Sequence, residues 1–176
     1  MARDVSERAC SPRPPTKGKN RKADVRHLID TQILVGWREW LALPKLGVNR
    51  IKAKIDTGAR TSALHATDIE LFKEGELRLV RFTVEPHAGG ARDRAKIHCQ
   101  APVKDERSVK SSNGVVERRV VIVTPVAVGA RRLNIEITLT NRAEMGFEML
   151  FGRTALRAGR FLVHPSRSFL QSQNIR

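Results

Sequence analysis

The stretch IDTGARTSALH, residues 55–65, decides how this sequence is interpreted. It continues the run RIKAKID, residues 50–56, in which apolar and polar residues alternate as they do in a half-buried β-strand, with Ile51, Ala53 and Ile55 on one face. Asp56 therefore stands at the end of a strand, and Gly58 allows the chain to turn sharply after it. The triplet Asp-Thr-Gly fits two interpretations here: an ordinary turn, or one half of a carboxylate pair that activates water.

The second interpretation has a specific chemical requirement. Two carboxylates held close together cannot both ionise, so they share one proton. One carboxylate then acts as a base toward water and the other as an acid toward a peptide carbonyl. Asp-Thr-Gly occurs once in the sequence, so a conventional pair requires Asp56 from two chains related by a two-fold axis. We therefore expect a homodimer; Asp105 is a same-chain alternative, although an exposed loop acid is the commoner role.

The same alternation of apolar and polar residues extends over most of the chain. Strand-like segments cover residues 33–44, 75–86, 95–103, 107–124, 131–142 and 159–165. In the second of these, Leu77 and Leu79 are expected to point inward, and Asn113-Gly114 is typical of a two-residue hairpin turn. The run EMLFGRTALRAG, residues 148–159, gives the one convincing helix start. The pattern predicts a mainly β domain with one short helix near its end.

Composition divides the chain in two and suggests the kind of partner. The 176 residues carry a net charge of +15, which favours anionic partners such as nucleic acid or an acidic protein segment. Residues 1–30 hold eight Lys or Arg against four Asp or Glu and few apolar residues, so we predict a disordered basic tail that could contact RNA or the ribosome. Residues 31–176 are predicted to form the folded domain.

Cysteine content and hydropathy bear on the compartment. Cys10 and Cys99 form no disulfide framework, and Cys99 is expected to be a small buried hydrophobic residue. The sequence contains no run of about 18 apolar residues and no apolar signal segment at its start. We therefore expect a cytoplasmic protein without a membrane partner.

About ninety residues after the Asp-Thr-Gly triplet comes Met-Leu-Phe-Gly-Arg, residues 149–153, an apolar run that leads into the predicted helix. Together the two motifs resemble retropepsin-like aspartic peptidases. The closest resemblance is to the bacterial family named ATP-dependent zinc proteases, and it rests on residues 35–66, 107–122 and 139–156. It implies a retropepsin-like (acid protease) closed β-barrel.

The resemblance also implies an activity and a substrate class. Members of this family are associated with Rim-type ligases, which add glutamates to the tail of a ribosomal protein. The implied function is an aspartic-type endopeptidase or glutamyl hydrolase that acts on an acidic, oligoglutamate-like tail. Asp56 would activate water, and Thr57 and Gly58 would shape the loop. Lys54 and Arg60 would hold substrate carboxylates.

Further candidates for the site are less specific. His65 lies near Asp56 in sequence and could contact substrate, while Arg118 and Arg119 on the return arm of the predicted hairpin could face an acidic peptide. The hairpin itself could be a flap over the substrate or a surface turn. Viral retropepsins often place an Asp at the position of Arg60, where it pairs with the Arg of the Gly-Arg segment. Arg153 therefore needs another acid, with Glu39, Glu144 and Glu148 as candidates.

The family's name does not fit the motifs of this chain. It contains neither the phosphate-binding pattern G-x-x-x-x-G-K-[ST] nor the zinc pattern H-E-x-x-H. His98 and Cys99 are adjacent on a predicted strand and point to opposite faces, so they are poorly placed to share a metal. We therefore predict a mechanism without metal or other cofactor. Two alternatives stay open: a non-catalytic basic module that binds RNA, the ribosome or a glutamate ligase, and a zinc-dependent peptidase.

Overall fold

The computed structural model describes residues 32–86, 95–110, 114–143 and 145–171. The predicted tail, residues 1–30, lies outside this part of the chain. The strands are β1 (Ile33–Gly36), β2 (Arg38–Leu43), β3 (Val48–Asp56), β4 (Ser62–His65), β5 (Thr67–Glu74), β6 (Leu77–Val84), β7 (Ile97–Lys110), β8 (Val116–Val128), β9 (Arg131–Thr140), β10 (Met149–Gly152) and β11 (Phe161–His164). A 3-10 turn (Pro44–Leu46) and one α-helix, α2 (Arg153–Ala158), complete the described elements.

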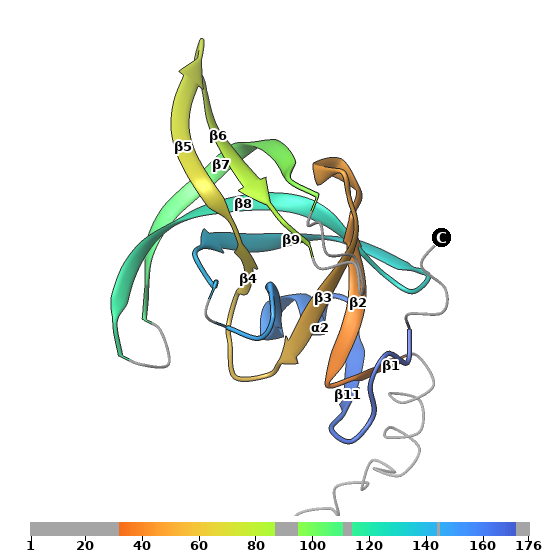
Figure 1. The fold of residues 1–176 in the computed structure, drawn as a ribbon. Helices are drawn as coiled ribbons and strands as arrows, with labels where there is room; N and C mark the ends of the chain where they lie inside the picture. The colour runs from red at the N-terminus through yellow and green to blue at the C-terminus, as the bar shows by residue number, and fades with distance from the viewer. Residues whose placement is uncertain (1–31, 87–94, 111–113, 144, 172–176) are drawn as a thin grey trace, which may run out of the picture. The chain divides into compact units, whose positions relative to one another are not determined.

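Six strands close into a barrel (Figure 1). Their order is β2-β3-β10-β4-β9-β8, and β8 pairs back with β2 through Ala127 and Ala42. The barrel interior is filled by aliphatic and aromatic side chains, among them Leu41, Ile51, Leu64, Ile122, Ile137, Leu139, Met149 and Phe151. The predicted fold class, a mainly β retropepsin-like closed barrel with one short helix, is confirmed.

Strand β3 delivers the Asp-Thr-Gly motif to the end of the barrel. The predicted inward face is confirmed, since Ile51 and Ala53 are fully buried and Ile55 is nearly so. Lys54 lies on the opposite face and is exposed. Because the buried residues fix the register of β3, they also fix where the strand ends and the Asp56 loop begins.

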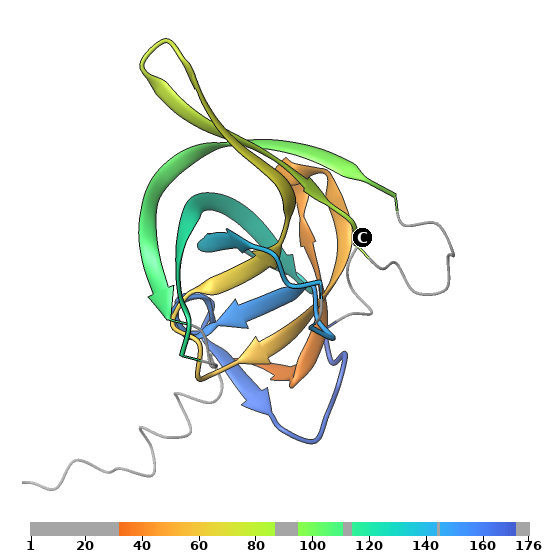
Figure 2. The ribbon, with the colours of Figure 1, turned by 60° about the vertical axis from the view of Figure 1, so that its left-hand side comes forward.

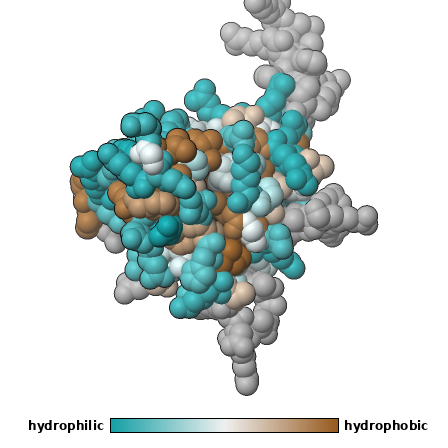
Figure 3. Space-filling model, turned by 90° about the horizontal axis from the view of Figure 1, so that it is seen from above, coloured by the Kyte–Doolittle hydropathy of each residue, from teal (hydrophilic) through white to brown (hydrophobic). Residues whose placement is uncertain are grey.

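Two strands extend beyond the barrel as a hairpin. In Figure 2, β5 and β6 reach away from the other strands as a narrow ribbon. The prediction that Leu77 points inward is wrong, because Leu77 is 62% exposed while Leu79 is 6% exposed. Leu77 begins β6 at the far end of this hairpin. Apolar and polar residues still alternate there, but no core is present to bury the apolar side chains. Apolar side chains are accordingly visible among hydrophilic ones on the face seen in Figure 3.

Strand β7 is longer than its sequence suggests. A short strand was expected at residues 95–103, but β7 runs from Ile97 to Lys110 and pairs with β6 along its first part and with β8 along its second. The last pair of the β7–β8 hairpin joins Lys110 and Val116. The predicted turn residue Asn113 lies outside the described residues, and Gly114 has a φ of 83°. Within the described ranges, no helix has the length and apolarity needed to cross a membrane.

Candidate active site

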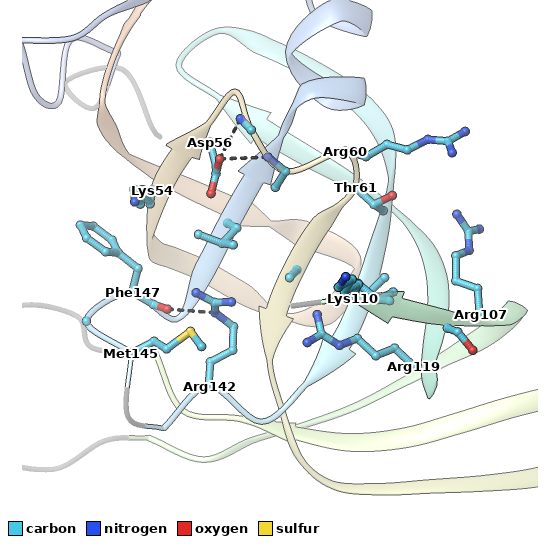
Figure 4. A pocket seen from close by; sticks show the side chains of 18 residues that line it. Lys54, Asp56, Arg60, Thr61, Arg107, Lys110, Arg119, Arg142, Met145 and Phe147 are labelled. Atoms are coloured by element: carbon cyan, nitrogen blue, oxygen red, sulfur yellow. Dashed lines mark hydrogen bonds between the residues drawn. The ribbon is translucent and has the colours of Figure 1, made fainter. Parts of the chain in front are cut away.

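The Asp56 carboxylate is held by its own loop. Asp56 Oδ1 accepts hydrogen bonds from the backbone amides of Gly58, at 2.9 Å, and of Ala59, at 3.0 Å (Figure 4). These two donors favour a single orientation of the side chain. One carboxylate oxygen is thereby fixed to the backbone. Among the described residues the other accepts no hydrogen bond, so it can bind a water molecule or a substrate.

The segment that follows β10 supports this loop from the other side. β10 runs parallel to β3 and places Gly152 opposite Asp56. The backbone amide of Arg153 donates to the Ala59 carbonyl at 2.8 Å, and the backbone amide of Thr154 donates to the Arg60 carbonyl at 3.0 Å. The loop is therefore held between two sequence segments that are distant in the chain.

Arg153 binds a backbone group of this loop. Its Nη1 atom donates to the Thr57 carbonyl at 3.3 Å. Glu39, one of the acids considered for Arg153, is fully buried and accepts the backbone amides of Gly36 and Leu170. Glu144, another of these acids, lies outside the described residues. Arg153 supports the Asp-Thr-Gly loop through the Thr57 carbonyl oxygen.

Asp56 opens into a pocket of about 850 Å³ whose lining is strongly basic (Figure 4). Asp56 is the one acid among the described lining residues. Six cationic side chains share the pocket with it: Lys54, Arg60, Arg107, Lys110, Arg119 and Arg142. They come from β3, the Asp56 loop, β7, β8 and the loop after β9, so folding gathers cations that are far apart in the sequence.

Two of these cations are already paired with acids. Arg107 forms ion pairs with Asp105 and Glu136, and its hydrogen bond holds the pKa of Asp105 below the usual value. The pKa of Glu136 is lowered as well, chiefly by the hydrogen bond from Lys104. Arg119 Nε donates to Glu117 at 2.7 Å. Arg107 and Arg119 therefore add less free positive charge to the pocket than their number suggests.

Within the described ranges, no ion pair is formed by the other four cations, which are Lys54, Arg60, Lys110 and Arg142. Of these, Arg142 has the most restrained position. Its backbone amide donates to His65 Nδ1 at 2.8 Å, and its Nε atom donates to the Phe147 carbonyl at 3.3 Å. Burial lowers the pKa of the Arg142 guanidinium, the positive charge of Arg119 lowers it further, and the negative charge of Asp56 opposes both. Arg142 is thus half-buried and lies within electrostatic reach of Asp56.

The structure brings together part of the predicted site. Lys54, Gly58 and Arg60 line the pocket with Asp56. Thr57 contributes its carbonyl to Arg153. His65 is not among the lining residues that the structure describes, and it contacts the pocket indirectly through Arg142.

The structure also separates two neighbouring arginines. Arg118 Nε donates to Glu106 at 3.1 Å on the exposed surface, whereas Arg119 faces the pocket. Adjacent residues of a strand point to opposite faces, so Arg118 and Arg119 cannot both face the same site. Asp105 is paired with Arg107 and is absent from the described lining, so it is not placed as a partner for Asp56.

Arg107, Lys110 and Arg142 are the lining cations that sequence reasoning missed. Arg107 and Lys110 lie in the second half of β7, and Arg142 follows β9 in a loop. None of these positions has a periodic or motif signal that separates it from the other basic residues of this cationic chain. The pairing of β7 with β8, and of β9 with β4 and β8, brings them toward Asp56.

The described residues offer little for a metal ion. In those ranges, no three His, Cys, Asp or Glu side chains come together as a metal site would require. Cys99 is buried and its thiol donates to the Leu46 carbonyl, while the exposed His98 has its Nδ1 atom 3.3 Å from Thr83 Oγ1. His98 and Cys99 therefore face different surroundings, as their adjacency on a strand predicted.

Curated relatives and solved structures provide a comparison for this fold and site. The chain is 42% identical over 144 residues to a Shewanella halifaxensis protein named "Probable alpha-L-glutamate ligase", a match that covers 82% of the chain and 31% of the relative. It is 44% identical over 138 residues to a Parasynechococcus marenigrum protein of the same name, covering 78% of the chain and 29% of that relative. The chain thus spans less than a third of these relatives.

A crystal structure from Legionella pneumophila, of a protein of unknown function, has the same fold. The TM-score is 0.65 at 24% identity, and the match covers 79% of this chain and 98% of that one. The family model described as "Retropepsin-like aspartic endopeptidase RimB" matches residues 34–174. The chain therefore belongs to the RimB-like family of retropepsin-like aspartic endopeptidases.

Proposed function

We propose that this protein hydrolyses an amide bond in an acidic peptide, such as an oligoglutamate tail, with Asp56 as the group that activates water. The observation that carries this proposal is the pocket that Asp56 shares with six Lys and Arg side chains. A neutral or basic substrate gains nothing from such a lining. A peptide with several carboxylates would be attracted to the pocket and oriented within it.

The relatives supply a second, independent support. Two proteins that contain a region about 42–44% identical to this chain are named as probable alpha-L-glutamate ligases. A ligase of that class makes amide bonds to glutamate, and a peptidase of this family breaks amide bonds. An oligoglutamate chain is therefore the substrate class that connects the relatives' names with the basic pocket.

The proposed mechanism uses Asp56 from two chains of a homodimer. One Asp56 is ionised and takes a proton from the bound water, whose oxygen attacks the amide carbon. The protonated Asp56 donates to the carbonyl oxygen, and a tetrahedral intermediate forms. When this intermediate collapses, the C–N bond breaks and the leaving nitrogen takes the proton that the first Asp56 removed from water. A hydroxyl proton of the intermediate returns to the second Asp56. The products are a free carboxylate and a free amine.

The β7–β8 hairpin is proposed to act as a flap in this mechanism. Ser108, Val109 and Lys110 of β7 line the pocket, so the last part of β7 borders the space that substrate would occupy. A flap at this position would limit the access of bulk water during the reaction. It would also bring the Lys110 charge toward an acidic substrate.

A mass-spectrometric time course tests the proposed function. Wild-type protein and Asp56→Asn are incubated with a peptide that ends in several glutamates, in the presence of a chelator. We expect the wild type to release glutamate and the variant to lose activity by roughly a thousand-fold or more, as removal of one member of a catalytic unit does. The same peptide with glutamines serves as the substrate control.

Three other outcomes would contradict the proposal. Equal cleavage by Asp56→Asn would exclude Asp56 as the activating group. Loss of wild-type activity in chelator, restored by zinc, would favour the zinc peptidase. Binding of RNA with a steep salt dependence and no peptide cleavage by either protein would favour the basic binding module.

A further inference from the structure

Arg142 differs from the other cations of the pocket in its surroundings. Lys54, Arg60 and Lys110 are exposed, and water solvates exposed charges at little cost. Arg142 is half-buried and, within the described ranges, no acid lies in ion-pair contact with its guanidinium, although the charge of Asp56 acts on it from a distance. A charge that is partly removed from water, with no anion in direct contact, is costly. Such a group is retained most readily where a ligand supplies the missing anion.

The orientation of Arg142 is fixed before any ligand binds. Its backbone amide is held by His65 Nδ1 and its Nε atom by the Phe147 carbonyl. The Phe147 ring is held in turn by an edge-to-face contact with Trp37, at 5.7 Å between centroids, and lies 5.5 Å from Lys52 Nζ. The guanidinium therefore loses little conformational freedom when it binds an anion.

The position of Arg142 relative to Asp56 indicates which anion it would bind. Figure 4 shows the Arg142 side chain pointing from its loop toward Asp56, whereas Arg60 extends away from Asp56. The charge of Asp56 acts on Arg142, so the two groups border the same part of the pocket. An amide bond placed at Asp56 would carry the side chain of an adjacent residue toward this guanidinium.

We propose that Arg142 determines specificity by binding the side-chain carboxylate of the glutamate adjacent to the cleaved amide bond. His65 is a positioning residue, because it contacts the Arg142 backbone and does not line the pocket. This inference rests on the proposed function for its substrate class. It assigns one arginine to one substrate carboxylate, whereas the basic pocket as a whole attracts any anion.

Kinetics with single-substitution peptides test the assignment. Oligoglutamate peptides with one Glu→Gln change on either side of the cleaved bond are compared for wild type and Arg142→Gln. A charge-assisted hydrogen bond makes the wild type prefer the glutamate peptide by roughly 10- to 100-fold in kcat/KM at one of these positions. Arg142→Gln should reduce that preference to about two-fold and leave the preference at other positions unchanged.

The matched control removes a charge near the opposite end of β9. Arg132 lies near the start of β9, is exposed and is outside the described pocket lining, whereas Arg142 follows the end of β9. Arg132→Gln should keep the full preference for glutamate. If Arg142→Gln keeps it too, or if both variants lose it equally, the assignment of Arg142 is overturned.

The positioning role of His65 is tested separately, with two substitutions at that residue. His65→Ala should weaken the preference at the same peptide position as Arg142→Gln, because the loop that carries Arg142 loses an acceptor. His65→Asn should restore much of it, since the Asn oxygen can accept the Arg142 amide. Equal loss of activity on glutamate and glutamine peptides in His65→Ala, with no rescue by Asn, would overturn the positioning role.

Binding measurements separate this inference from the proposed function. The affinities of Asp56→Asn and of Asp56→Asn/Arg142→Gln for the glutamate peptide and for each single-glutamine peptide are measured by calorimetry. If tighter binding of the glutamate peptide depends on Arg142, the inference is supported even when wild-type protein cleaves no peptide. In that case only the proposed hydrolysis is rejected. Cleavage by wild type without any Arg142-dependent discrimination would retain the hydrolase and reject the assignment.

Discussion

Gly152 lies directly opposite Asp56 in the parallel pairing of β10 with β3. A Cβ atom at Gly152 would lie 2.6 Å from the carbonyl carbon of Thr61 and 2.8 Å from its oxygen. The backbone of the Asp56 loop and that of the Gly-Arg segment therefore approach each other more closely than a side chain allows. Because the two segments lie so close, the backbone amide of Gly152 can donate a hydrogen bond to Ser62 Oγ at 3.1 Å.

Gly152→Ala should destabilise the protein and displace the Asp56 loop. The conflict is with backbone atoms, which cannot move aside as a flexible side chain can, so we expect a loss of about 1–3 kcal/mol in the free energy of unfolding. Urea denaturation measures it. Gly146→Ala is the control, because nothing lies within 4 Å of its Cβ position. Equal stability of the two variants would show that the close approach at Gly152 is unimportant.

Local patterns predicted the central part of this fold well. The alternation from residue 50 to 56 placed Ile51, Ala53 and Ile55 in the core and Asp56 at the strand end, as the structure shows. The pattern worked there because one face of β3 packs against the barrel interior. It failed at Leu77, because the β5–β6 hairpin leaves the core and alternation no longer reports burial.

The cations of the pocket could be predicted only in part, for a related reason. Lys54 and Arg60 are neighbours of Asp56 in sequence, and proximity along the chain was enough to suggest them. Arg142 reaches the pocket only because β9 pairs with β4 and β8 in the closed barrel. To choose between Arg118 and Arg119, one must know which face of β8 is turned toward the pocket. The sequence does not show this, because the polar start of β8 lacks the apolar alternation that marks a buried face.

Glu39→Gln should loosen the attachment of the C-terminal segment. The fully buried Glu39 carboxylate accepts the backbone amides of Gly36 at 2.7 Å, Leu170 at 2.8 Å and Gln171 at 3.1 Å. An amide side chain loses the charge and turns one acceptor into a donor, which costs about 1–3 kcal/mol of stability.

Thermal denaturation and hydrogen exchange at residues 169–171 measure the effect of Glu39→Gln. Glu70→Gln, at an exposed position of β5, is the control for loss of one acidic charge. Unchanged exchange at these amides in Glu39→Gln would contradict the proposed attachment.

Cys99 should make the protein less stable at alkaline pH. Burial raises the pKa of the Cys99 thiol from 9.0 to about 11. Above pH 9 the unfolded chain loses this proton while the folded chain keeps it. The contribution of Cys99 to the free energy of unfolding is therefore fully present below pH 9 and is lost as the pH rises to about 11. The slope from this group approaches 1.4 kcal/mol per pH unit.

Urea titrations at pH 8, 9, 10 and 11 measure this slope against that of Cys99→Ala. The comparison removes the contributions of Lys residues, which titrate in the same range in both proteins. We expect the wild type to lose more stability than Cys99→Ala above pH 9. Parallel curves would mean that the folded protein ionises Cys99 as readily as the unfolded chain does.

The proposed pairing of two Asp56 residues makes a quantitative prediction for mixtures. If each active unit needs Asp56 from two chains, a chain of Asp56→Asn inactivates every wild-type chain with which it pairs. With random pairing, activity per wild-type chain falls to about one half in an equal mixture and to about one tenth with a nine-fold excess of the variant. Subunits are exchanged by mixing the proteins in denaturant and refolding them together.

The control mixture contains wild type with a nine-fold excess of Arg118→Gln/Asp56→Asn, which removes a second charge outside the described pocket lining. It should inhibit to the same degree, because inhibition follows from the missing Asp56 carboxylate. Sedimentation velocity on the same samples reports whether dimers are present. Activity per wild-type chain that stays constant at every ratio would show that Asp56 works within one chain, and the two-fold pairing would have to be abandoned.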